Sequence, residues 1–302
     1  MSAWKDPEIA MVRAVLAAMP DAPSAEGLTF AERRPGMDAF GDSAPLPEGH
    51  VWEAATFAGR PAEWHTPPGA DPSKVILYLH GGGYCIGSPR SHRGLSAQLA
   101  HCAGARAVTP DYRMGPEDPF PGAIDDALAC YRALLDQGFA PGKIVIAGDS
   151  AGGGLTLATA LAIRAAGLPQ PTGLFVISPW ANLRPTGPSY GAKADTDPMI
   201  TAKALNDFAD AYLVGADAKN ILASPAQADF SGLPPILIHV GSEECLLSDA
   251  IAVAERAGLA SVACQLEIWP EMIHVWHAFY GLLGAGRAAI RSAGDWIGER
   301  FD

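Results

Sequence analysis

The sequence predicts an α/β fold in which a mostly parallel, eight-stranded sheet carries helices on both faces, and two patterns point to it. Short β-branched or apolar runs alternate with longer segments of helical periodicity, as in parallel sheets whose strands are joined by helices. The central apolar runs are nearly continuous, as expected of strands that are buried on both faces. The length of 302 residues fits one large α/β domain with additional segments.

The individual elements follow from these two periodicities. The predicted strands, rich in β-branched and apolar residues, lie near Val51–Phe57, Ala62–His65, Val75–His80, Arg106–Pro110, Ile144–Ala147, Leu174–Ser178, Ile236–Val240 and Val262–Ile268. The predicted helices, with apolar residues three and four positions apart, are Arg93–Cys102, Ala123–Gln137, Leu155–Ala166, Ala202–Val214, Ser248–Ala257 and Arg287–Ile297.

Two regions interrupt the alternation of strands and helices. Residues 1–45 contain an amphipathic segment, Ile9–Met19, followed by a Pro/Gly-rich stretch, and residues 184–222 insert a loop and a helix between two strands. We expect both to form a lid over the carboxyl edge of the sheet, where open α/β folds bind ligands. Residues 46–302 would then be the catalytic domain, with 184–222 as its lid insertion. The alternative is that residues 1–45 form a partly mobile tail and that residues 184–222 are a decorative insertion.

The composition excludes several classes of protein. Apolar residues make up 49% and charged residues 18%, which supplies a core, and the net charge of −12 disfavours nucleic acid and anionic membranes as partners. The start of the chain lacks a signal-peptide pattern, and the most apolar helix candidate is too short to span a membrane, so we expect a cytoplasmic protein. Five scattered cysteines without a C-x-x-C pair are expected to be reduced.

A candidate nucleophile lies between a predicted strand and a predicted helix. The segment Gly148–Gly152 reads Gly-Asp-Ser-Ala-Gly, and a G-x-S-x-G block in this context forms a tight turn that projects the serine above the sheet. The segment Gly187–Gly191 matches the same template, but it lies in a proline-punctuated loop without a preceding strand. The context therefore selects Ser150.

Candidate oxyanion donors follow the third predicted strand, where the chain reads His80-Gly81-Gly82-Gly83. Successive residues without side chains let backbone N–H groups approach a substrate closely, and such a loop supplies the oxyanion hole of many esterases and lipases, together with the N–H after the nucleophile. Here that last donor is Ala151. Each donor contributes about 3–4 kcal/mol to lowering the barrier.

The general base should follow the acid, which in turn follows the serine. His239, His274 and His277 are the histidines beyond Ser150, but His239 lies within a strand, ahead of any acid in the next loop. His274 is nearer the end of the last predicted strand than His277, so we favour it as the base. A metal site formed by Glu271, His274 and His277 is a weaker alternative.

The acid is expected in the loop after Ile236–Val240, which contains Glu243, Glu244 and Asp249. Both glutamates lie close to the strand end, whereas Asp249 is interpreted as a cap of the next helix. The residues alone do not decide whether Glu243 or Glu244 is the catalytic acid.

The chain resembles the bacterial hormone-sensitive-lipase-like esterases, the family IV lipolytic enzymes. The resemblance extends from about residue 50 and rests on His80–Gly83, Asp111–Pro121, Gly148–Gly153, Ser178–Trp180 and Met272–His274. It implies an α/β-hydrolase core under a lid, oxyanion donors at Gly82, Gly83 and Ala151, and cleavage of short-chain carboxylic esters without a cofactor. It also suggests a homodimer.

One departure from the family affects the choice of the acid. Where the family commonly has Asp-Pro-Leu, with the catalytic Asp first, this chain has Glu244-Cys245-Leu246. The resemblance therefore favours Glu244. We expect a serine carboxylesterase with the triad Ser150, His274 and Glu244, acting on a small-molecule ester. The alternatives are an amidase or lactonase with the same triad, or a non-catalytic receptor.

Overall fold

The computed structural model describes residues 5–18 and 27–301, and its centre is one eight-stranded sheet. The strands are β1 (Val51–Phe57), β2 (Arg60–Thr66), β3 (Asp71–Leu79), β4 (Ala105–Pro110), β5 (Ile144–Asp149), β6 (Gly173–Ile177), β7 (Ile236–Gly241) and β8 (Cys264–Trp269), in the order β1-β2-β4-β3-β5-β6-β7-β8. Strand β2 runs antiparallel to β1 and β4, and the remaining pairs are parallel. The predicted α/β fold with a mostly parallel sheet is confirmed.

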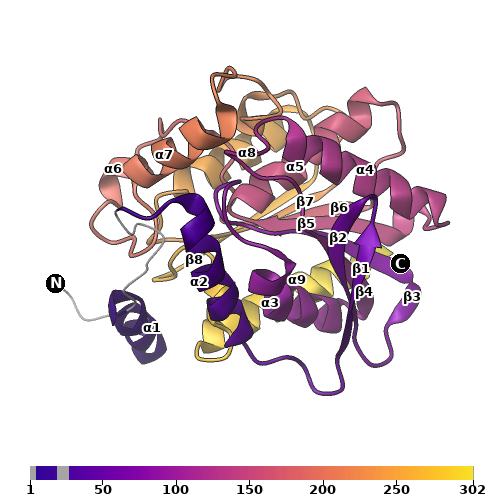
Figure 1. The fold of residues 1–302 in the computed structure, drawn as a ribbon, viewed down its shortest axis with the longest axis horizontal. Helices are drawn as coiled ribbons and strands as arrows, with labels where there is room; N and C mark the ends of the chain where they lie inside the picture. The colour runs from indigo at the N-terminus through magenta and orange to yellow at the C-terminus, as the bar shows by residue number, and fades with distance from the viewer. Residues whose placement is uncertain (1–4, 19–26, 302) are drawn as a thin grey trace.

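Helices cover both faces of the sheet, and the strand residues alternate between them (Figure 1). In β3, Val75, Leu77 and Leu79 pack in one core cluster with α4 and α5, whereas Ile76 and Tyr78 pack in another with α3 and α9. This alternation is the period of two of a strand. The covering helices are α3 (Pro89–Ala103), α4 (Gly122–Asp136), α5 (Ala151–Ala165), α8 (Leu247–Leu259) and α9 (Gly284–Phe301), with short 3₁₀ turns η1 (Pro141–Lys143), η2 (Pro225–Gln227) and η3 (Trp276–Phe279).

The sheet has a topological switch point at β3. This strand pairs with β4 on one side and with β5 on the other, so the connections from these strands leave toward opposite faces. Such a point opens a crevice at the carboxyl ends of the strands. The glycine loop after β3 and the serine after β5 lie at this crevice, because Leu79 and Gly148 are paired in register.

Among the described residues, four further helices lie outside the covering layers: α1 (Pro7–Ala18), α2 (Phe30–Asp42), α6 (Ser189–Ala192) and α7 (Ala202–Leu213). They lie in the left half of Figure 1, away from the C-terminus. Helix α1 matches the predicted amphipathic segment up to Ala18, and Met19 lies outside the described residues. The buried Ile9, Val12 and Leu16 attach α1 to the segment that carries His274, through a shared apolar cluster.

Helix α2 lies in the Pro/Gly-rich stretch, where no helix was predicted from the sequence. The helix begins with a capping box: Thr29 Oγ1 accepts from the N–H of Glu32 at 3.3 Å, and the Glu32 carboxylate accepts from the N–H of Thr29 at 2.9 Å. This reciprocal pair satisfies two backbone donors at the helix start. Pro35 is accommodated inside the helix.

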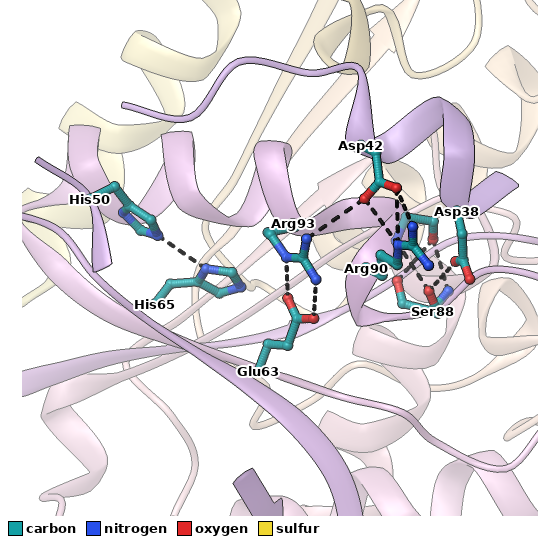
Figure 2. A network of polar contacts seen from close by, with 9 residues as sticks. Asp38, Asp42, His50, Glu63, His65, Ser88, Arg90 and Arg93 are labelled. Atoms are coloured by element: carbon teal, nitrogen blue, oxygen red, sulfur yellow. Dashed lines mark hydrogen bonds and ion pairs between the residues drawn. The ribbon is translucent and has the colours of Figure 1, made fainter. Parts of the chain in front are cut away.

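Ion pairs attach α2 to the body of the molecule. Figure 2 shows Arg93 of α3 between Glu63 of β2 and Asp42 of α2, with Arg90 beside the same aspartate. The Arg93 guanidinium donates two hydrogen bonds to the Glu63 carboxylate, at 2.6 and 2.8 Å, and lies 3.7 Å from Asp42. A bidentate arginine–carboxylate pair holds a defined geometry. Helix α2 is therefore anchored at its carboxyl end.

Candidate active site

Ser150 occupies a strained turn between β5 and α5. Its φ is +54°, in a region that residues other than glycine rarely adopt, at a cost of about 1–3 kcal/mol. Two hydrogen bonds hold the turn: the N–H of Ser150 donates to the carbonyl of Ile177, and the N–H of Trp180 donates to the carbonyl of Ser150, both at 2.8 Å. A side chain at Gly152 would collide with the carbonyls of Leu79 and His80.

The structure brings Ser150, His274 and Glu244 together, although they lie far apart in the chain. His274 Nε2 is 3.0 Å from Ser150 Oγ, and His274 Nδ1 is 2.8 Å from Glu244 Oε2. The three groups form one continuous hydrogen-bonded chain, and each is almost completely buried. This is the arrangement in which an imidazole can accept the proton of a hydroxyl while a carboxylate orients it.

The other candidates face different partners. The Glu243 carboxylate lies 3.3 Å from Lys193 Nζ, and His277 Nε2 lies 3.1 Å from His239 Nδ1. The Glu271 carboxylate accepts hydrogen bonds from the backbone N–H groups of Lys5 and Asp6. Glu271, His274 and His277 therefore do not converge on one point.

Asp249 does not cap its helix, so that expectation was wrong. Helix α8 has Leu246 at its N-cap, and the buried Asp249 carboxylate reaches across to accept hydrogen bonds from the N–H groups of Ala181 and Asn182 and from the hydroxyl of Tyr190. Burial raises the pKa of Asp249 to about 7. The hydrogen bonds of Asp249 attach α8 to the loop after β6.

Ser178 is a further member of the site. The sequence marks it only as part of Ser178–Trp180, one of the segments shared with the family. Ser178 Oγ donates to Glu244 Oε1 at 2.9 Å and accepts from the N–H of Val275 at 3.2 Å. The N–H of Gly241 also donates to Glu244 Oε1. These bonds hold the acid and the loop of the base in one geometry. No spacing in the sequence marks a serine for such a role.

The electrostatics of the pair favour a cationic imidazole. Burial opposes protonation of His274, but the hydrogen bond and the charge of Glu244 outweigh it and raise the His274 pKa above its usual range. Burial also disfavours the charged form of Glu244 and so raises its pKa, and the hydrogen bond from His274 offsets part of that rise. Glu244 therefore stabilises the imidazolium that forms when His274 takes a proton.

The glycine loop after β3 lies beside the serine. Gly82 and Gly83 line the same cavity as Ser150, and both have positive φ values, +114° and +62°. A side chain at Gly82 would collide with the carbonyl of Ile86. In the described part of the chain, no hydrogen bond uses the backbone N–H of Gly82, Gly83 or Ala151.

A largely apolar cavity opens above these groups. The empty space of the cavity is about 990 Å³ when the open solvent at its mouth is included. Helix α2 contributes Met37 and Phe40, and helix α7 contributes Leu205 and Phe208. The ionisable side chains at the wall are few: His92, Asp149, His274 and Tyr280. A cavity of this kind suits a small, uncharged and mainly apolar ligand.

Two properties of the described residues bear on the class of protein. Across residues 5–18 and 27–301, no helix combines the length and the apolar character needed to cross a membrane. Nor do three or more His, Cys, Asp or Glu side chains of these residues gather as a metal site would require.

Comparison with known proteins places the chain in a family. The family of the alpha/beta hydrolase fold matches residues 76–278, more than half of the chain. An acetyl-hydrolase from Streptomyces hygroscopicus is 45% identical over 261 residues, which cover 86% of each chain. A carboxylesterase from Mycobacterium tuberculosis is 32% identical and aligns with 72% of this chain and 73% of its own.

Solved structures give the same result. An esterase from the bacterial hormone-sensitive lipase family has a TM-score of 0.94 at 40% identity, covering 99% of this chain and all of the other. The esterase EstE5, from a crystal soaked with p-nitrophenyl butyrate, has a TM-score of 0.93 at 43% identity, covering 98% and 99%. Since sequence and fold agree over almost the whole chain, this protein belongs to the bacterial hormone-sensitive-lipase-like esterases and is a carboxylic ester hydrolase.

Proposed function

We propose that the protein hydrolyses short-chain carboxylic esters through a Ser150–His274–Glu244 triad. The observation that carries the proposal is the unbroken chain of contacts from the Ser150 hydroxyl through both nitrogens of His274 to Glu244. Ser150 Oγ attacks the ester carbonyl carbon while His274 Nε2 takes the hydroxyl proton, and Glu244 holds the imidazole by its Nδ1–H.

Each later proton transfer uses the same imidazole. As the tetrahedral intermediate collapses, the bond to the alkoxy group breaks, and His274 gives its proton to the departing alcohol. Water then attacks the acyl-enzyme carbonyl and loses a proton to His274. The second tetrahedral intermediate expels Ser150 Oγ, which recovers its proton from His274, and the carboxylic acid leaves.

The oxyanion is assigned to the N–H groups of Gly82, Gly83 and Ala151. Support comes from their position: Gly82 and Gly83 border the cavity beside Ser150, and Ala151 supplies the first N–H of α5. None of the three is used within the described fold. The positive end of the α5 dipole adds to the effect.

The preference for short acyl chains is supported by two similar proteins, and the apolar lining of the cavity suits an acyl chain. One relative is named an acetyl-hydrolase, and a crystal of another, the esterase EstE5, was soaked with p-nitrophenyl butyrate. We therefore assign acyl chains of two to about six carbons, held against the apolar wall.

The lid is assigned to residues 1–45 and 184–222, insofar as the structure describes them, over a catalytic domain of residues 46–302. Helices α2 and α7 come from these two segments, and both line the cavity. The Phe30 and Phe208 rings lie 4.9 Å apart, and Arg33 lies over both rings, so the two helices are joined above the site. From the family resemblance we also propose a homodimer, which light scattering would test. We further propose the cytoplasmic location expected from the sequence, which cell fractionation would test.

The decisive test compares the wild type with Ser150→Ala on p-nitrophenyl esters of two to twelve carbons, with matched anilides for amide cleavage. We expect the wild type to favour the short esters over long esters and over anilides, and to be labelled by a fluorophosphonate. Labelling and turnover should both disappear in the variant. An active Ser150→Ala enzyme would refute the triad. Cleavage of the anilides faster than the matched esters would mean that amide hydrolysis is the main activity.

A further inference from the structure

A second histidine–carboxylate pair lies beside the nucleophile. Asp149 is the last residue of β5, directly before Ser150, and its Oδ2 lies 3.3 Å from Nε2 of His92 on α3. Both side chains are almost completely buried, and both line the cavity. The proposed mechanism does not use this pair.

Both ring nitrogens of His92 have polar partners. Ser91 Oγ donates to the carbonyl of Ser88, and with its proton placed there His92 Nδ1, 2.8 Å from Ser91 Oγ, is the donor between the two. His92 Nε2 lies 3.3 Å from Asp149 Oδ2 and also 3.3 Å from the backbone nitrogen of Gly81. The buried carboxylate favours a second proton on the ring, and in that state the Gly81 N–H donates to Asp149 Oδ1 alone.

The surrounding groups favour the same state. Burial opposes the charge of His92, but Asp149, through its charge and a hydrogen bond, and Asp38 of α2, at longer range, raise the His92 pKa above its usual range. Tyr78 of β3 and His80, the residue after the strand, also face the ring. Burial lowers the pKa of His80 to about 3 and raises that of Tyr78, so both neighbours stay neutral.

The pair is attached to the loop that carries the proposed oxyanion donors. Asp149 Oδ1 accepts from the N–H of Gly81 at 3.1 Å and from the Tyr78 hydroxyl at 2.7 Å. A side chain at Gly81 would collide with the Asp149 carboxylate, so the loop lies directly against it. Because Gly81 precedes Gly82 and Gly83, its position determines where their N–H groups point.

We propose that His92 is a positioning residue for ester hydrolysis, which acts as a cation paired with Asp149 to hold Gly81 at the start of the oxyanion loop. The pair also neutralises a carboxylate that would otherwise oppose the negative charge developing on the substrate next to Ser150. This inference rests on the proposed function, because it assigns the oxyanion to the Gly82 and Gly83 amides.

The first experiment measures kcat and KM of His92→Gln, which keeps a side-chain donor and removes the charge. Because the effect arises in the transition state, we expect kcat to fall roughly 10- to 100-fold, with KM within about threefold of the wild type. His101→Gln is the matched control, since His101 is an exposed histidine on the same helix. A His92→Gln enzyme with the kcat of the control would overturn the proposal.

The pH profile separates positioning from a general loss of structure. The cation is present below the raised pKa of His92 and is lost as the pH rises through it, so wild-type kcat should fall on the alkaline side. His92→Gln should lack that alkaline limb. Should it prove unstable, Asp149→Asn is the second variant: it keeps an acceptor for Gly81, and it too should lose activity and the limb. An unchanged limb in both variants would contradict the role of the pair.

A measurement without catalysis tests the pair independently of the triad. The His92 imidazole is followed by NMR in Ser150→Ala, its resonance being identified by its absence in the double variant Ser150→Ala/His92→Gln. We expect titration above pH 6.5, the usual value, and a shift to lower pH when Asp149→Asn is added. If His92 titrated below pH 6.5, or if Asp149→Asn did not shift its titration, the ion pair of His92 with Asp149 would be refuted. Failure of the proposed triad would show itself differently, as esterase activity in Ser150→Ala.

Discussion

The floor and the cover of the cavity are built by different means. The floor, at the ends of β3 and β5 and in the loop of His274, is held by buried hydrogen bonds between groups of defined geometry. The cover, α2 and α7, presents apolar side chains such as Met37 and Phe208 and is anchored by ion pairs that are partly exposed. Hydrogen bonds depend on direction, whereas apolar contacts depend mainly on shape. The floor should therefore determine the reaction and the cover the choice of substrate.

The largest effects are expected in the floor, at the groups that carry out the proposed chemistry. Ser150→Ala or His274→Ala should each lower kcat by about four to six orders of magnitude, leaving a residual rate of roughly 10³–10⁴ over water from the oxyanion donors and binding. Turnover of p-nitrophenyl butyrate measures this. A loss below tenfold in either variant would contradict the assignment.

A smaller loss is expected when the acid is neutralised in place. Glu244→Gln should lower kcat by roughly 10³–10⁴, because the amide no longer stabilises the imidazolium. Wild-type activity should fall as the pH drops through the raised His274 pKa, since the base works in its neutral form. Without the Glu244 charge, this acid limb should move to lower pH.

Glu243→Gln is the matched control for Glu244→Gln. Its carboxylate pairs with Lys193 rather than with His274, so kcat should stay within about twofold of the wild type. If Glu243→Gln showed the larger loss of the two, the roles of the two glutamates would be exchanged.

The anchor of the cover should affect stability more than chemistry. Arg93→Met leaves the nearly buried Glu63 carboxylate without its bidentate partner, so the free energy of unfolding should fall by about 1–3 kcal/mol, with kcat nearly unchanged. Arg90→Met is the control, because Arg90 and Asp42 are exposed and should contribute little. Urea unfolding compares the two, and an equal loss in both would mean that burial of the pair does not matter.

The smallest effect is expected on substrate choice in the cover itself. Phe208→Ala enlarges the cavity, so the ratio of kcat/KM for octanoate over butyrate esters should rise up to about tenfold. Phe208 also packs against Gly83, but a disturbance of that loop would affect both esters and cancel in the ratio. Val214→Ala, exposed at the end of α7, should leave the ratio unchanged. An unchanged ratio in Phe208→Ala would place the acyl chain elsewhere.

Local patterns in the sequence predicted those elements whose structure depends on interactions between neighbouring residues. The strands and covering helices follow their apolar periodicity within a few residues, and the strand–turn–helix context singled out Ser150 over the second G-x-S-x-G block. Helix α2 was missed because Pro35 and Gly36 outweighed the capping signal of Thr29 and Glu32, which is visible in the sequence.

The positions of side chains in space were harder to predict. Asp249 was interpreted as a helix cap, yet burial and three donors determine its position: two N–H groups of the loop after β6 and the Tyr190 hydroxyl of α6. The contact of Ser178 with the acid and the pairing of His92 with Asp149 join segments that are 57 or more residues apart. No local pattern reports such contacts.

The sequence by itself determined the α/β class of this protein, the order of its strands and helices and the turn that holds Ser150, because each depends on neighbouring residues and on a period of 2 or 3.6. The tertiary structure decided which glutamate lies against His274, which histidine faces the serine and which helices cover the cavity. These depend on strand register and burial, and both arise only when distant segments exclude water together.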